Sequence, residues 1–138
     1  MVAPHVLRVR FEQQAMNGAI YILDERRRGI TLEAIRAVCQ YRMWGLLAVH
    51  VRSTHVHVVV EIPSDPREAA ADFKEYSSRA LNRSSAADAD LKKWARGMSI
   101  RRLASAEARE RAIRYVIAGQ GDPMSCLVAP HRESEPCP

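Results

Sequence analysis

The stretch Arg52-Ser-Thr-His-Val-His-Val-Val-Val-Glu-Ile62 decides the fold of this chain. Successive side chains of a strand point to opposite faces, so the alternation places His55, His57 and Glu61 on one face. The other face is uniformly β-branched, which is typical of a strand that lies over a buried core. Histidines two apart on a strand are separated by about 6.5–7 Å, so both imidazoles can reach one metal ion. The stretch therefore predicts a core strand with a metal site on its open face.

The composition indicates a single basic domain. The 138 residues suffice to bury a core, and 21 Lys+Arg against 16 Asp+Glu give a net charge of +5. Arginine predominates over lysine, which favours nucleic acid as the partner, with a mildly basic soluble protein as the alternative. The sequence has neither an apolar stretch of membrane-spanning length nor a signal-peptide pattern. Three cysteines without CxxC spacing predict neither a disulfide framework nor a cysteine zinc site, and indicate a reducing cytoplasm.

Hydrophobic periodicity and turn residues predict an α+β fold with about four strands and three helices. The predicted strands are residues 6–13, 19–23, 46–51 and 55–62, and Asn17-Gly18 is the hairpin turn between the first two. The predicted helices are residues 32–44, 66–82 and 105–118, capped at Thr31 and Asp65 in the first two cases. Residues 24–29 are predicted to be a charged loop, and residues 125–138 a loosely ordered tail after a domain of residues 1–124.

A basic segment, residues 92–102, contains one tryptophan among lysines and arginines. Basic side chains interleaved with an aromatic suit single-stranded nucleic acid, because phosphates pair with the charges and bases stack on the ring. Burial of Trp94 beneath a basic surface is the alternative. The predicted DNA-binding residues are Lys74, Arg79, Lys92, Lys93, Trp94, Arg96, Arg101 and Arg102.

Three motifs in this order resemble a known family. They are residues 44–57 ending in His55-Val-His57, residues 72–82 around Tyr76, and Tyr115-Val-Ile-Ala-Gly-Gln-Gly121. Together they resemble the HUH single-tyrosine transposases of small bacterial insertion sequences, including the REP-associated tyrosine transposases. The resemblance covers roughly residues 32–124.

The resemblance implies a ferredoxin-like antiparallel sheet with the helices on one face and the histidines on an exposed strand face. In the family, residues matching His55 and His57 hold Mg2+ or Mn2+, and a residue on the tyrosine helix, here Gln120, completes the ligand set. The tyrosine, here Tyr115, attacks a phosphodiester of hairpin-forming single-stranded DNA. The products are a 5′-phosphotyrosine link and a free 3′-OH. The resemblance also allows a homodimer.

The sequence leaves two assignments open. The family spacing separates tyrosine from glutamine by four residues, whereas five separate Tyr115 from Gln120. Five residues place side chains about 140° apart on a regular helix, so Gln120 reaches the site only if Gly119 ends the helix. Glu61 is the alternative third ligand. Tyr76 is the alternative nucleophile, although its spacing also fits a packing stripe.

Other protein classes compete with the resemblance. A histidine-triad hydrolase is excluded because Val59 stands where its third histidine would lie, and a cupin is disfavoured because this chain has three predicted helices. The remaining rival is a catalytically impaired, domesticated module that binds DNA hairpins or single strands without cleaving them.

His50, just before the bend at residues 52–54, is predicted to be structural or to support the metal ligands.

Overall fold

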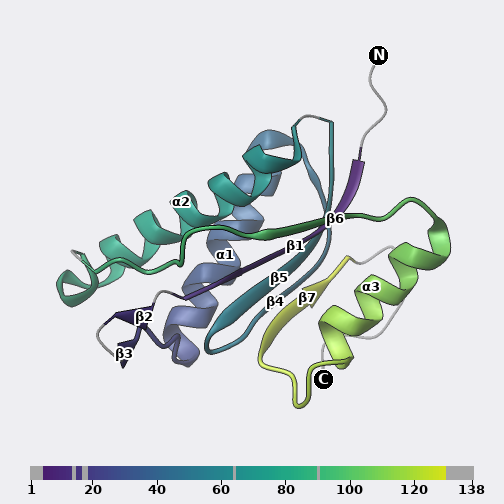
Figure 1. The fold of residues 1–138 in the computed structure, drawn as a ribbon. Helices are drawn as coiled ribbons and strands as arrows, with labels where there is room; N and C mark the ends of the chain where they lie inside the picture. Colours follow the sequence, from purple (N-terminus) through teal and green to yellow (C-terminus); the bar gives the residue numbers. More distant parts are fainter. Residues whose placement is uncertain (1–4, 14, 17–18, 64, 90, 130–138) are drawn as a thin grey trace.

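A five-stranded antiparallel sheet forms the centre of the molecule (Figure 1). This computed structural model describes residues 5–13, 15–16, 19–63, 65–89 and 91–129. The strand order is β6-β1-β5-β4-β7, so the histidine strand β5 is central. The strands of this sheet are β1 (His5–Glu12), β4 (Gly45–Val51), β5 (His55–Ile62), β6 (Ser99–Arg102) and β7 (Ser125–Val128). The α+β class with an antiparallel sheet is confirmed, with five strands where the sequence predicted about four.

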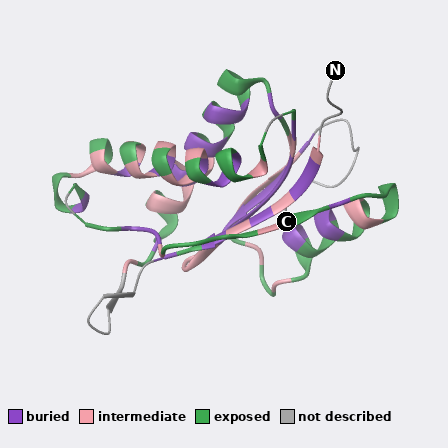
Figure 2. Ribbon diagram, turned by 45° about the horizontal axis from the view of Figure 1, so that its top comes forward, coloured by how far each residue is buried: buried purple, intermediate pink, exposed green. Residues whose placement is uncertain are grey.

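Helices cover both faces of the sheet (Figure 1). The β-branched side chains of β5 join the larger core beneath α1 (Glu25–Arg42) and α2 (Pro66–Ser84). A smaller core on the opposite face joins α3 (Ala106–Ala118) to Val59 of β5. The prediction that all helices pack on one face is wrong for α3, because the histidine-bearing face also carries apolar side chains that need cover. In Figure 2 the buried strands lie between helices whose outer surfaces are exposed.

The first helix begins earlier than the sequence predicted. Asp24, rather than Thr31, caps α1, and its side chain accepts a hydrogen bond from the backbone N–H of Arg27. Arg27 also donates two hydrogen bonds to Asp88, at 3.1 and 3.0 Å. Residues 25–29 are therefore the first turns of a helix and not a charged loop, because a distant carboxylate pairs with the arginine side chain.

The later helices match their predictions closely. Asp65 caps α2, which has Pro66 in its first turn. Ser105 caps α3, and the Ser105 side chain accepts a hydrogen bond from the backbone N–H of Ala108. The hairpin ribbon is shorter than predicted: β2 (Ala15–Met16) pairs with β3 (Ala19–Ile20), and the predicted turn at residues 17–18 lies outside the described residues.

The segment after α3 returns to the sheet. β7 pairs with β4 from Val51↔Ser125 to Ala48↔Val128, so residues 125–128 are an edge strand and not a loose tail. Residues 130–138 lie outside the described residues. Cys39 is a buried free thiol, whereas Cys126 is disulfide-bonded, which the sequence did not predict. Among the described residues, no helix is both long and apolar enough to span a membrane.

Candidate active site

The two histidines of β5 lie under α3 rather than on an open surface. Their ring centroids are 5.2 Å apart and their planes are nearly perpendicular, at 89°. His55 is half-buried, and His57 keeps only 3% of its surface exposed. The predicted exposed strand face is therefore wrong, because α3 packs over this part of the sheet. The pair therefore lies in the space between β5 and the end of α3.

Both histidines are held in the neutral form. Burial is the main reason why the pKa of His57 is lowered to about 3, and the neighbouring His55, Arg10 and Arg8 side chains contribute to the same shift. Burial also lowers the pKa of His55. Nδ1 of His57 is buried and has no hydrogen-bond partner among the described residues. A neutral imidazole with an unpartnered nitrogen is what a metal ion requires of a histidine ligand.

Gln120 reaches the histidines because α3 ends before it. The helix stops at Ala118, and the N–H of Gly119 donates to the carbonyl of Tyr115. A Cβ atom on Gly119 would lie 2.8 Å from Cδ1 of Tyr115 and 2.9 Å from its backbone, so only glycine fits this turn. Gln120 then lies with Oε1 3.1 Å from Nε2 of His55. The 140° separation expected of a regular helix does not apply.

Tyr115 faces the same space from α3. Its ring centroid lies 5.8 Å from that of His57, with the planes at 87°, and 44% of the residue is exposed. The guanidinium carbon of Arg8, on β1, lies 5.5 Å from the centroid of the tyrosine ring. A phenol, two imidazoles, an amide oxygen and a guanidinium therefore converge from three elements.

The two alternatives left open by the sequence do not reach this space. Tyr76 packs against the core beneath α1 and α2, on the other face of the sheet. Glu61 lies opposite Gly45, four residues beyond His57. Among the described residues, no three His, Cys, Asp or Glu side chains gather closely enough to hold a metal ion. The geometry favours Tyr115 over Tyr76, and Gln120 over Glu61.

Comparison with known proteins places the chain in a family. The family model described as "Transposase IS200 like" matches residues 12–117, which include β5 and most of α3. This chain is an IS200-like transposase. No protein of curated function is recognisably similar to it in sequence.

Solved structures share the fold of this transposase. One is a REP-associated tyrosine transposase bound to a REP hairpin, with a TM-score of 0.64 and 11% identity over 86% of this chain and 67% of that one. Another is a protein from Deinococcus radiodurans R1 put forward as a transposase, with a TM-score of 0.63 and 12% identity over 84% of this chain and 91% of that one. At such low identity these similarities establish the fold.

Several predicted DNA-binding residues of the transposase are structural. Lys93 is buried and donates to Asn82 and to two backbone carbonyls, and Trp94 is buried against Phe11. Lys74 donates to the carbonyls of Ala95 and Gly97. Lys93 and Trp94 therefore have no surface to offer DNA, because segment 91–97 folds back onto α2 and β1. The predicted residues that remain exposed are Arg79, which pairs with Glu75, together with Lys92, Arg96, Arg101 and Arg102.

Arginines that the sequence analysis overlooked lie beside the site. Arg8 and Arg10 are on β1, and Arg10 is the ladder partner of His57. On β6, Arg101 is the ladder partner of Arg8, so these two side chains share the face of the histidines. No carboxylate in the described part of the chain pairs with Arg8 or Arg101. The alternation of residues 6–13 signalled outward-facing arginines, but only the strand order places them beside β5.

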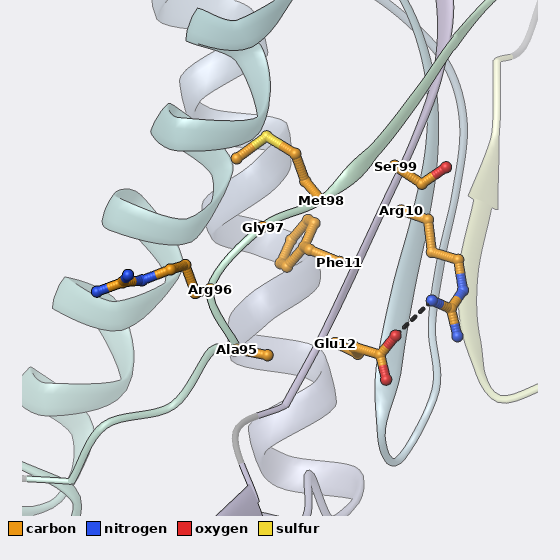
Figure 3. A pocket seen from close by; sticks show the side chains of 8 residues that line it. All are labelled: Arg10, Phe11, Glu12, Ala95, Arg96, Gly97, Met98 and Ser99. Carbon is orange, nitrogen blue, oxygen red and sulfur yellow. Dashed lines mark hydrogen bonds and ion pairs between the residues drawn. The ribbon is translucent and has the colours of Figure 1, made fainter.

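A cavity of about 340 Å³ adjoins Arg10 (Figure 3). Its walls are residues 10–12 of β1 and the segment Ala95–Ser99. Arg10 and Glu12 form an ion pair of 2.6 Å, drawn as a dashed line in Figure 3. Because their ladder partners are His57 and His55, the cavity lies one strand away from the histidine pair.

Proposed function

We propose that this transposase cleaves and rejoins single-stranded DNA through a covalent 5′-phosphotyrosine at Tyr115. The observation that carries the proposal is the convergence of Tyr115, His57, His55 and Gln120 from β5 and the end of α3. This convergence supports an enzyme over the rival DNA-binding module, whose main support was the spacing of Tyr115 and Gln120. A binding module has no need of a nucleophile beside two neutral histidines.

The donor atoms around this space fit a divalent metal ion. His55 and His57 supply neutral ring nitrogens, Nδ1 of His57 lacks a partner, and Gln120 supplies an amide oxygen. We propose that these three side chains hold Mg2+ or Mn2+, whose remaining positions suit water and phosphate oxygens. Such an ion, when bound, polarises the phosphodiester and stabilises the charge that develops on its oxygens.

The chain's own residues supply the nucleophile and its surroundings. The Tyr115 hydroxyl releases its proton to solvent and its oxygen attacks phosphorus, the bond from phosphorus to the 3′ oxygen breaks, and that oxygen takes a proton from solvent and leaves as a 3′-OH. Arg8 lies over the tyrosine ring with its charge unpaired by any carboxylate of the described residues. A guanidinium in this place suits the phosphate that approaches Tyr115.

Arginines on β1 and β6 could contact further phosphates of the DNA, beyond the one that reacts. Arg8, Arg10 and Arg101 lie on one face of the sheet, and Arg10 also lines the cavity beside β6. We propose that they bind the backbone of a hairpin-forming strand; the REP-associated relative is bound to such a hairpin. A homodimer and a cytoplasmic location stay predictions from the sequence.

Incubation with labelled single-stranded DNA from the flanks of the gene tests the proposal. With Mg2+ or Mn2+, wild-type protein should form a denaturation-resistant adduct that carries a 3′ label and not a 5′ label. Tyr115→Phe should abolish the adduct, and Tyr76→Phe should form it normally. An adduct that persists in Tyr115→Phe would assign the nucleophile elsewhere. DNA binding without any adduct would favour the binding module.

A further inference from the structure

A third histidine, His50, lies beneath the end of α3. It is on β4, directly opposite His57 in the ladder, and it is fully buried. Nε2 of His50 accepts a hydrogen bond of 2.8 Å from the backbone N–H of Met124. That nitrogen must therefore carry a lone pair, so the proton of the neutral ring is on Nδ1. Nδ1 accordingly donates to the carbonyl of Val116, at 2.6 Å.

The two partners of His50 bracket the turn that contains Gln120. Val116 lies in the last helical turn, directly after Tyr115, and Met124 lies directly before β7. The carbonyl of Val116 also accepts a hydrogen bond of 3.0 Å from Nε2 of Gln120. Because the amide nitrogen of Gln120 is engaged there, its oxygen is turned towards His55. One carbonyl thus connects His50 to the orientation of Gln120.

Arg52 provides a second connection to the same turn. Its Nη1 donates to the carbonyl of Asp122, at 2.9 Å, and lies 3.5 Å from Nε2 of His50. The side chains of Arg52 and His50 therefore hold the bend between β4 and β5 against the turn after α3. Both ring nitrogens of His50 are occupied by the backbone, so this histidine is not available to a metal ion.

We propose that His50 is a positioning residue, which fixes the end of α3 so that Tyr115 faces His57 and the oxygen of Gln120 faces His55. This inference rests on the proposed function, because it assigns His50 a part in the same reaction. A buried side chain at this place must offer one donor and one acceptor about 2 Å apart. Neutral imidazole does so, and the amide of glutamine is the nearest substitute.

Three variants separate positioning from general stability. His50→Phe keeps a flat aromatic ring, somewhat larger than imidazole, and removes both hydrogen bonds. His50→Gln restores one donor and one acceptor. Val49→Ala is the matched control, because Val49 is the fully buried neighbour of His50 on β4 but faces the core beneath α1 and α2. The free energy of unfolding, the affinity for single-stranded DNA and the rate of adduct formation are measured for each.

We expect His50→Phe to slow adduct formation by about 10- to 100-fold, the usual effect of removing a group that orients a ligand. DNA affinity should change much less, and His50→Gln should recover part of the rate. Val49→Ala should lose stability without a comparable loss of rate. In a Gln120→Ala background, His50→Phe should reduce the rate of adduct formation by a much smaller factor than it does in the wild type, because both residues act through the same turn. The positioning role would be overturned if His50→Phe slowed adduct formation by the same factor in both backgrounds. It would also be overturned if Val49→Ala slowed adduct formation as much as His50→Phe does.

Amide hydrogen exchange decides the inference independently of the chemistry. The N–H groups of Gly119 and Met124 donate to Tyr115 and His50 respectively. In His50→Phe, exchange of these two amides should accelerate, whereas in Val49→Ala they should exchange as slowly as in the wild type. Unchanged exchange of both amides in His50→Phe would refute the inference. If wild-type protein forms no adduct, the proposed function fails, and this measurement still shows whether His50 holds the turn.

Discussion

Nε2 of His55 lies 3.1 Å from Oε1 of Gln120, a residue 65 positions further along the chain. The contact joins the central strand of the sheet to the turn that ends α3. It arises because Gly119 ends the helix one residue before Gln120, so that the amide turns back towards the sheet. Tyr115 and Gln120 thereby face the same pair of histidines.

Replacing Gln120 tests its place in the proposed metal site. Gln120→Ala removes the amide oxygen, and we expect Mn2+ affinity, measured by calorimetry or electron paramagnetic resonance, to fall by about 10-fold or more. Gln120→Glu should bind at least as tightly as wild type, because a carboxylate is a stronger ligand for this ion. Gln40→Ala, at an exposed position of α1, is the control. Equal Mn2+ affinity in Gln120→Ala and Gln40→Ala would remove Gln120 from the ligand set.

Arg8 should contribute one phosphate contact to DNA binding. We expect Arg8→Ala to weaken binding of single-stranded DNA by roughly 10-fold and to reduce the slope of log Kd against log salt by about 0.7. Arg8→Lys should keep the slope and lose part of the adduct rate, because lysine lacks the planar group that lies over Tyr115. Fluorescence anisotropy at several salt concentrations measures both effects. Arg36→Ala, exposed on α1, should bind as wild type does, and a salt slope unchanged in Arg8→Ala would contradict the assignment.

The ion pair between Arg27 and Asp88 should stabilise the fold. The Asp88 side chain is 1% exposed, and the hydrogen bonds from Arg27 are the main reason why its pKa lies below the usual value. Arg27→Leu leaves this carboxylate buried without its principal partner, so we expect urea unfolding to show a loss of about 3 kcal/mol. The double variant Arg27→Leu/Asp88→Leu should recover much of that loss. A loss below about 0.5 kcal/mol in Arg27→Leu would mean that the pair adds little.

Cys39 should make the fold less stable in alkali. Burial raises the pKa of its thiol from 9.0 to about 12, so the folded protein keeps a proton that the unfolded chain releases. This contribution to stability is complete below pH 9 and is lost as the pH rises towards 12. Between pH 8 and pH 10 we expect the wild type to lose about 1.4 kcal/mol more than Cys39→Val in urea unfolding. Parallel pH profiles for the two proteins would show that the thiol has the same pKa in the folded and the unfolded protein, and would contradict the prediction.

The sequence by itself determined the central strand and the last two helices, and it placed the two histidines on one face of that strand. Alternation in residues 55–62 placed the valines in the core and the histidines together on the other face, because strand periodicity is a local property. The cap Asp65 fixed the start of α2 for the same reason, and helical periodicity placed α3 close to residues 105–118. These features depend on neighbours in the chain, so the chain alone reveals them.

Only the tertiary structure decided which of these groups meet. Strand order brought Arg8 and Arg10 beside β5, and the second apolar face of the sheet drew α3 over the histidines. Asp88 stabilises the first turns of α1 from 61 residues away through Arg27, and Lys93 and Trp94 were buried by a segment that folds back onto α2. The sequence predicted that the last helix ends at residue 118, but only the packing of the following turn against β5 brought Gln120 to His55. Each of these features depends on contacts between segments that are distant in the chain. The free energies of such contacts cannot be inferred from the local sequence pattern.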